Sequence, residues 1–184
     1  MPEFYKETER LILRSPTEGD AEHLAAARST DFVMRYNLYR PCDGEQIRDE
    51  LGRFQHVMLC RREDGALIGC IAVKDDYLRY RVASCSLQAW LSEDTAYHGY
   101  MAEALYAFIP HLFSACGYER ISIQIFSDNT ASLRLAEKLG FEREGYLKRA
   151  VANENGHVFD VVLLSMDQKM YARHMEKMRD VQGN

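Results

Sequence analysis

The segment Ala89–Leu105 reads AWLSEDTAYHGYMAEAL and joins a strand pattern to a helix pattern around a single glycine, Gly99. Residues 85–91 alternate between apolar and polar side chains, which is typical of a half-buried strand. From Met101 onward, apolar residues recur at helical spacing until Gly117, which is a stop signal for a helix. The segment therefore predicts a strand, a polar loop and an amphipathic helix.

The loop around Gly99 has two interpretations. One glycine before a helix is ordinary turn chemistry. A helix N-terminus also offers unpaired N–H groups and partial positive charge, so it can bind a phosphate without a lysine. Because no Lys or Arg lies between Leu91 and Glu103, such a site would depend on backbone donors, with His98 as the one cationic side chain.

Strand and helix patterns continue on both sides of this segment. Pro110 lies inside the helix that follows Gly99 and predicts a kink there or a break near its last turn. The order predicts a mixed α/β domain around a central sheet. Further predicted strands are residues 10–14, 56–62, 66–74, 121–125, 141–151 and 158–166, and further helices are 20–27, 43–55 and 130–139, with a helical stripe over 170–178.

Length and composition restrict the class of protein. A chain of 184 residues with 47% hydrophobic residues suits one domain, which we assign to residues 1–168, followed by a helical tail at 169–184. The net charge of -5 argues against nucleic-acid binding. Five scattered cysteines without paired spacing, and no apolar run near the roughly 18 residues that span a bilayer, favour a reducing cytoplasm and no membrane.

The Gly99 segment resembles the acyl-CoA diphosphate loop of the GNAT superfamily of N-acetyltransferases, written Q/R-x-x-G-x-G/A. Gly99 matches the first glycine, whereas Ala96 and Met101 stand where Gln or Arg and a second small residue are usual. Longer stretches resemble the branch that acetylates the N-termini of ribosomal proteins. They are Leu87–Ala104, TERLILRSPTEGDAEHL (8–24), NTASLRLAEKLGFEREG (129–145) and HVFDVVLLSM (157–166).

The resemblance implies a GNAT-like α/β (α+β) fold and acetyl-CoA as cosubstrate. The expected sheet is central, mixed, twisted and mostly antiparallel, with about six or seven strands, about four flanking helices, and splayed central strands that form the acyl-CoA groove. Backbone amides near Trp90 and Leu91 are expected to contact pantetheine, and that of Leu91 to polarise the thioester carbonyl. The amides of His98, Gly99, Tyr100 and Met101 are expected to receive the diphosphate.

The predicted helix after Asp128 supplies further cofactor candidates. Asn129 matches a family position whose amide bonds the pantetheine arm, and it can also cap the helix. Many superfamily members protonate the departing thiolate with a tyrosine seven residues later, where this chain has Ala136. Ser132 is then the candidate general acid, with solvent or a merely helix-facing hydroxyl as alternatives. Lys138, together with Arg134, either reaches a CoA phosphate or is simply a solvated surface residue.

The acceptor side is less defined by the sequence. Met34, Tyr36 and Tyr39 lie in an aromatic segment that would shape the acceptor pocket. No motif selects a general base among the carboxylates, and Asp160 could instead hold the final hairpin. No histidine shows metal-ligand spacing or a nucleophile partner, so we expect no metal. The base candidates are Glu93, Asp94, Glu154 and Asp160, and the histidines concerned are His23, His56, His111, His157 and His174.

The expected activity is acetyl transfer from acetyl-CoA to a primary amine by direct attack in a ternary complex. The best acceptor is a protein N-terminal α-amine of ribosomal-protein type. Near pH 7, about a tenth of an α-amine of pKa ~8 is neutral, against less than about one in a thousand for a lysine. The alternatives are a small-molecule amine, such as an antibiotic or metabolite, and a non-catalytic acyl-CoA-binding regulator. A monomer and a homodimer both remain open.

Overall fold

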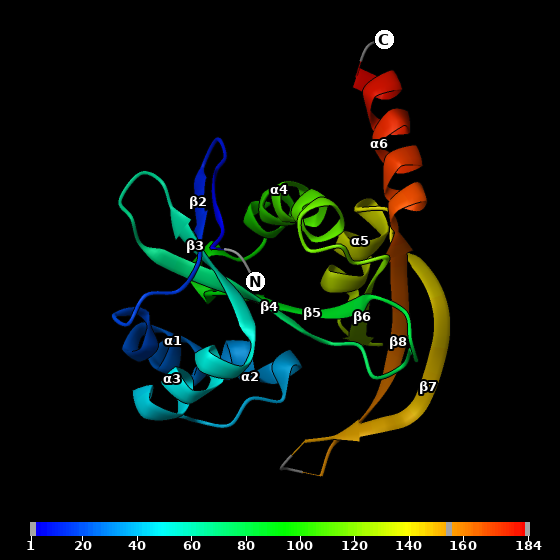
Figure 1. Cartoon of the computed structure of the whole chain (residues 1–184). Helices are drawn as coiled ribbons and strands as arrows, with labels where there is room; N and C mark the ends of the chain where they lie inside the picture. The colour runs from blue at the N-terminus through cyan, green and yellow to red at the C-terminus, as the bar shows by residue number, and fades with distance from the viewer. Residues whose placement is uncertain (1–2, 154–155, 183–184) are drawn as a thin grey trace. The chain divides into compact units, whose positions relative to one another are not determined.

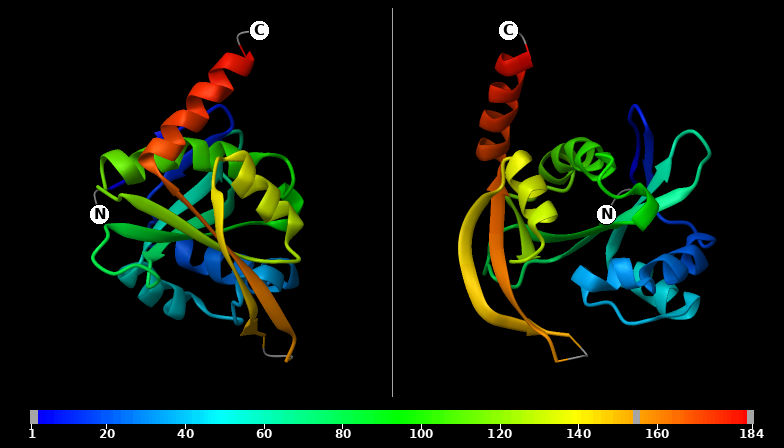
Figure 2. Two further views of the ribbon diagram at one scale, coloured as in Figure 1. Left: turned by 90° about the vertical axis from the view of Figure 1, so that its right-hand side faces the viewer. Right: turned by 180° about the vertical axis from the view of Figure 1, so that it is seen from behind.

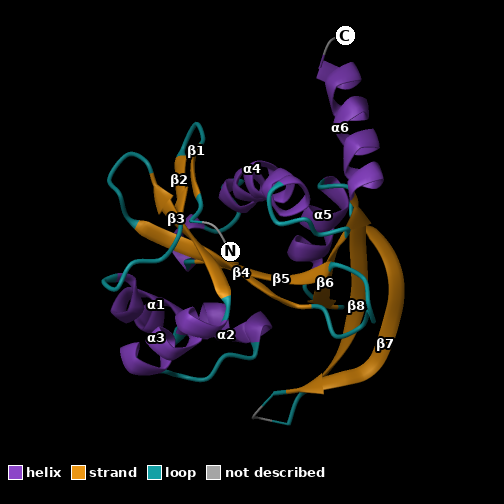
Figure 3. Cartoon of the chain, viewed as in Figure 1, coloured by secondary structure: helices purple, strands orange, loops and turns teal. Residues whose placement is uncertain are grey.

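A computed structural model describes residues 3–153 and 156–182 (Figure 1). Over these residues there are eight strands and six α-helices, which exceeds the predicted six or seven strands and about four helices (Figure 3). The additional elements in the body are β1 (Tyr5–Glu7) and α2 (Asp31–Asn37), and the tail forms α6 (Gln168–Gln182). The predicted turn at 153–156 includes residues outside the described part of the chain.

The strands form one mixed sheet in the order β1-β2-β3-β4-β5-β6-β8-β7. The β5–β6 pair is parallel, and the β1–β2, β2–β3, β3–β4, β6–β8 and β7–β8 pairs are antiparallel. The predicted mixed, mostly antiparallel sheet is thereby confirmed. The remaining strands are β2 (Leu11–Arg14), β3 (Gln55–Arg61), β4 (Leu67–Asp75), β5 (Ser84–Leu91), β6 (Arg120–Phe126), β7 (Glu142–Ala152) and β8 (Val158–Asp167).

The chain divides into two compact units, and β5 has residues in both. The first unit contains residues 1–74 and 87–109. In it, α1 (Asp20–Arg28), α2 and α3 (Gly44–Arg53) lie together beside β3 and β4 (Figure 1). Their apolar residues pack with Met58, Cys70 and Trp90 in a buried cluster. An Asp43 capping box fixes the start of α3.

The second unit contains residues 75–86 and 110–184. Its β7 and β8 form a long curved hairpin (Figure 2). A buried polar network ties the β4–β5 loop to this sheet, because Arg79 Nη1 donates to Asp76 Oδ2 at 2.7 Å and to Ser122 Oγ at 2.6 Å. Arg79 and Arg120 also donate to Glu144. These charge-assisted bonds give the second unit a rigid frame.

Two helices that were predicted from the sequence have clear local causes. Helix α4 (Tyr100–Ser114) begins directly after Gly99 and continues through Pro110 for four more residues. Helix α5 (Thr130–Lys138) begins where the Asn129 Oδ1 accepts a hydrogen bond from the Ser132 N–H at 3.2 Å, so the predicted cap is formed.

Candidate active site

The end of β5 is fixed by the neighbouring strand β4. Between the pairs Leu59–Gly69 and Cys60–Leu67, β4 has one extra residue, Ile68. The Ile68 carbonyl accepts a hydrogen bond from the N–H of Ser92 at 2.8 Å, directly after β5. This bond holds the first residue after β5 against β4.

Gly69 lies directly against the last two residues of β5. A Cβ built on Gly69 would be 2.4 Å from the Trp90 carbonyl oxygen and 3.2 Å from Leu91 Cα. Such a close approach of two backbones is available only to glycine. Trp90 is 6% exposed and belongs to the core cluster, so its indole packs in the core and does not face a ligand.

The loop before α4 turns sharply and leaves helix N–H groups free. Gly99 has φ +84° and Tyr97 has φ +65°, and the Gly99 carbonyl accepts the hydrogen bond from Glu103 N–H at 3.1 Å. Within the described residues, no hydrogen bond engages the N–H groups of Tyr100, Met101 or Ala102. Free N–H groups at the positive end of a helix of 15 residues favour a phosphate.

Met101 does not obstruct this loop. Its side chain is 9% exposed and packs in the core of the first unit, as the helical stripe predicts. The missing second small residue of the motif therefore does not remove the N–H donors of the helix N-terminus. His98 is exposed beside Tyr100, with their ring centroids 6.5 Å apart.

The structure adds a cation that sequence reasoning missed. Arg10, next to β2, donates through Nη1 to the His98 carbonyl at 3.0 Å and through Nε to Glu103 at 2.7 Å. Its guanidinium lies 4.5 Å from the centre of the Tyr100 ring. Arg10 lies within the quoted TERL stretch, but nothing in the sequence pairs that stretch with a loop almost 90 residues later.

The cofactor candidates of the second unit lie on α5. The Asn129 side chain caps the helix with its oxygen, which leaves its NH2 group to donate elsewhere. Ser132 is half-buried one turn later, and Ala136 is buried where a tyrosine would be expected. Lys138 and Arg134 are exposed.

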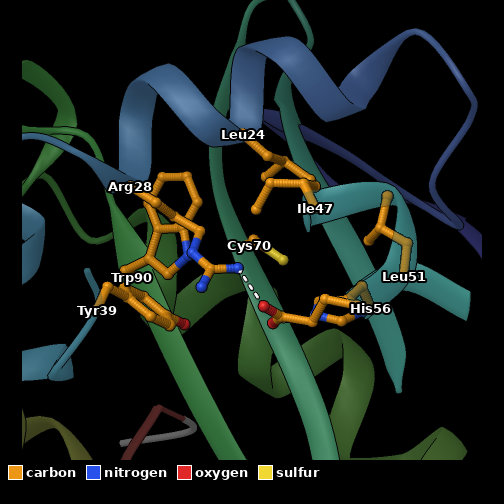
Figure 4. A pocket seen from close by; sticks show the side chains of 9 residues that line it. Leu24, Arg28, Tyr39, Ile47, Leu51, His56, Cys70 and Trp90 are labelled. Carbon is orange, nitrogen blue, oxygen red and sulfur yellow. Dashed lines mark hydrogen bonds and ion pairs between the residues drawn. The ribbon is translucent and has the colours of Figure 1, made fainter. Parts of the chain in front are cut away.

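The three predicted acceptor-side residues lie in or just after α2 but do not form one pocket. Tyr39 lines a small cavity of about 10 Å³, together with Arg28, Glu50, His56 and Trp90 (Figure 4). The Arg28 guanidinium lies 3.8 Å from the centre of the Tyr39 ring. Burial raises the pKa of Tyr39, so its hydroxyl stays protonated. Met34 and Tyr36 are half-buried and do not line this cavity.

A partly buried ionic group lines this cavity, and its bond from Arg28 is the dashed line in Figure 4. Glu50 accepts from Arg28 Nη1 at 2.7 Å, and its other oxygen lies 3.3 Å from His56 Nε2. The hydrogen bond with His56, against the opposing effect of burial and with help from Arg28, lowers the pKa of Glu50 to about 2. The cavity has room for one water at most, so it has no space for an acceptor as it stands.

A larger hollow of about 460 Å³ opens beside the turn that follows β5. Glu93 and Asp94 line it with Ser92, and Ala27 and Thr30 form its other wall. Two of the four candidate bases therefore border a space large enough for an amine substrate. Ser92, Glu93 and Asp94, which border the hollow, are the three residues that follow Leu91 in the chain.

The other two candidate bases have different outcomes. Asp160 accepts from the Tyr146 hydroxyl at 2.6 Å and from the Arg149 N–H at 2.7 Å, so it joins β7 to β8. The bonds from the Arg149 N–H and the Tyr146 hydroxyl, against the effect of burial and with help from nearby Lys148, lower its pKa. Glu154 lies outside the described residues. Within the described part of the chain, no three His, Cys, Asp or Glu side chains are grouped as metal ligands. None of the described helices has the length and apolarity needed to cross a bilayer.

Comparison with known proteins gives a consistent result. Residues 10–142 match the acetyltransferase (GNAT) domain family. The uncharacterized N-acetyltransferase YoaA of Bacillus subtilis is 31% identical over 172 residues, which cover 87% of this chain and 94% of that protein.

Solved structures share the fold at lower identity. The ribosomal-protein-S5-alanine acetyltransferase of Vibrio fischeri has a TM-score of 0.80 at 20% identity, covering 89% of this chain and 96% of that one. The spermidine N-acetyltransferase of Vibrio cholerae, solved with CoA and spermine, has a TM-score of 0.79 at 18% identity, covering 90% and 99%.

Proposed function

This chain belongs to the GNAT acetyltransferase family, and we propose from that premise that it transfers acetyl from acetyl-CoA to a primary amine by direct attack in a ternary complex. The observation that supports this most is the N-terminal turn of α4. Its free N–H groups and the positive φ of Gly99 fit a diphosphate without any lysine in the loop.

The thioester end of acetyl-CoA is assigned to the backbone at Trp90 and Leu91. Gly69 allows β4 to approach this point closely, and the Ile68 carbonyl fixes Ser92 just beyond it. A preorganised N–H of Leu91 stabilises the negative charge that develops on the carbonyl oxygen during attack. The amine nitrogen forms the new C–N bond, the C–S bond breaks, and CoA leaves as a thiolate.

The leaving thiolate needs a proton, which we assign to the Ser132 hydroxyl. Ser132 is half-buried on α5, and Ala136 offers no proton at the position where many family members have a tyrosine. If Ser132 is the acid, the Ser132→Ala variant loses kcat with little change in the KM for acetyl-CoA. An unchanged kcat would transfer this role to solvent.

A protein N-terminal α-amine is the proposed acceptor, because a larger fraction of it is neutral near pH 7 than of a lysine amine. Glu93 and Asp94 attract the protonated amine to the hollow, and one of them takes its proton directly or through a water. The same carboxylates favour a small cationic amine as the second candidate, since the hollow of about 460 Å³ accommodates one.

The experiment is CoA release from acetyl-CoA with a panel of peptides and small amines, with products identified by mass spectrometry. Acetylation of a peptide N-terminus supports the first candidate, and acetylation of small amines alone replaces it with the second. Measured CoA release with any acceptor excludes the non-catalytic regulator. Glu93→Gln and Asp94→Asn variants should raise the KM for the amine and leave the KM for acetyl-CoA unchanged, and the variant that removes the base should also lower kcat.

A further inference from the structure

The loop around Gly99, which binds the diphosphate in the proposed function, has no cationic side chain of its own other than His98. The N-terminal segment places Arg10 beside this loop. Three contacts place the Arg10 side chain. Nε donates to Glu103 Oε2 at 2.7 Å, Nη1 donates to the His98 carbonyl at 3.0 Å, and the guanidinium stacks on Tyr100 at 4.5 Å. Because the guanidinium is planar and contacted on two edges and one face, its orientation is determined.

Both carboxylate oxygens of Glu103 accept hydrogen bonds in this arrangement. Its Oε1 accepts from the Thr8 hydroxyl at 2.6 Å and from the Arg10 N–H at 2.8 Å, while Oε2 accepts from Arg10 Nε. Burial alone would raise the pKa of Glu103, and the bonds from Thr8 and Arg10 lower it below its usual value. Glu103 is therefore ionised at neutral pH and holds Arg10 against the first turn of α4.

The third nitrogen of the guanidinium faces the loop. A Cβ built on Gly99 would have Arg10 Nη2 as its nearest neighbour, at 3.5 Å. Within the described residues, Nη2 has no hydrogen-bond acceptor, and the Arg10 side chain is 42% exposed. Two N–H donors of a fixed guanidinium are thus available beside the glycine where the free helix amides begin.

We propose that Arg10 is a diphosphate-binding residue of this enzyme, which donates from Nη2 to a phosphate oxygen of acetyl-CoA beside the α4 N-terminus. This proposal rests on the proposed function, in which the loop binds the diphosphate. A fixed guanidinium offers charge-assisted bonds to phosphate, which are stronger than those from neutral amides. It also explains how a chain with a net charge of -5 binds an anion at a loop without lysine.

A purely structural role for Arg10 predicts a different pattern, and the choice of thioester distinguishes them. Acetyl-pantetheine has the reacting thioester but lacks the diphosphate. In the Arg10→Met variant, the KM for acetyl-CoA should rise about tenfold, as expected for one charge-assisted hydrogen bond, while kcat/KM with acetyl-pantetheine stays within about twofold. The Arg10→Lys variant keeps the charge but loses the fixed fork and should fall between the two.

Arg62 provides the matched control. It donates from Nη1 to the Thr8 carbonyl at 3.2 Å and lies within 3.5 Å of Glu7, so it belongs to the same turn but not to the loop. The Arg62→Met variant removes an equal charge and should change the KM for acetyl-CoA less than about twofold. A similar rise in the KM for acetyl-CoA in both arginine variants would mean that the overall positive charge of this region, and not a bond from Arg10, acts on the cofactor.

Two other outcomes are also decisive. If Arg10→Met weakens acetyl-CoA and acetyl-pantetheine equally, Arg10 acts only on the structure of the loop, and this inference is overturned. If the unmodified enzyme itself uses both thioesters with the same kcat/KM, the diphosphate contributes nothing, and the proposed phosphate site fails before Arg10 is considered.

Discussion

The Gly69→Ala substitution tests whether the backbone at the end of β5 is the thioester site. The new methyl group would be 2.4 Å from the Trp90 carbonyl oxygen and 2.8 Å from Leu91 Cδ2, whereas ordinary contacts begin near 3.4 Å. Relief therefore requires β5 to move by about 1 Å, at a cost of about 1–3 kcal/mol for overpacking. A displacement of about 1 Å at reacting groups can reduce the rate about 100-fold.

We expect the Gly69→Ala variant to remain folded, with a lowered free energy of unfolding in urea and a kcat reduced by one to two orders of magnitude. Gly52 is the matched control, because it lies exposed in α3 and a Cβ there would meet nothing within 4 Å. The Gly52→Ala variant should keep full activity and gain up to about 1 kcal/mol in stability. If Gly69→Ala loses stability but keeps the kcat of the unmodified enzyme, Trp90 and Leu91 do not position the thioester.

Three further predictions concern charges and a helix cap. The pKa of Glu50 is lowered to about 2, so the contribution of its ionised form to the free energy of unfolding is full above about pH 4.5 and is lost as the pH falls towards 2. The Glu50→Gln variant should be less stable at pH 7 and should show a shallower acid unfolding transition by circular dichroism. An unchanged unfolding curve would contradict the ionic pairing. Asp76→Asn should cost about 2 kcal/mol in urea unfolding, because it weakens a buried bond to Arg79, whereas the exposed Asp75→Asn should change little. Asn129→Asp keeps the oxygen that caps α5, so the stability should be unchanged, but the loss of the amide donor should raise the KM for acetyl-pantetheine. An unchanged KM would mean that Asn129 only caps the helix.

Sequence periodicity was the signal for β5 and α4, whose burial is one-sided. Strand β5 and helix α4 appear close to their predicted bounds, because each must turn an apolar face to the core. β1 (Tyr5–Glu7) was missed because its three residues are all exposed and it exists only by pairing with β2. Helix α2 was missed because its one buried residue, Val33, leaves no apolar stripe.

The residues of the candidate site also divide into those that the sequence predicted and those that only the fold brings together. Gly99 was accessible to sequence reasoning because its conformation depends on local chain geometry and leaves a signature in adjacent residues. The pairing of Arg10 with Glu103 and that of Arg28 with Glu50 depend on separations of 93 and 22 residues, which only the fold brings together. The Gly69 contact with Trp90 is likewise a property of two adjacent strands.

In the proposed function, the segment from Ser92 to Gly99 contacts a cationic group at one end and an anionic group at the other. Under the proposed function, Glu93 and Asp94 at its start border the hollow and would favour a cationic amine, whereas a phosphate bound at its end would require positive potential. A lysine in this loop would lie within a few residues of the two carboxylates and would pair with them. Backbone N–H groups cannot be neutralised by such pairing, and Arg10 is already fixed by Glu103. The separation of the two charges over eight residues is therefore a physical reason why the proposed phosphate loop would have no lysine of its own.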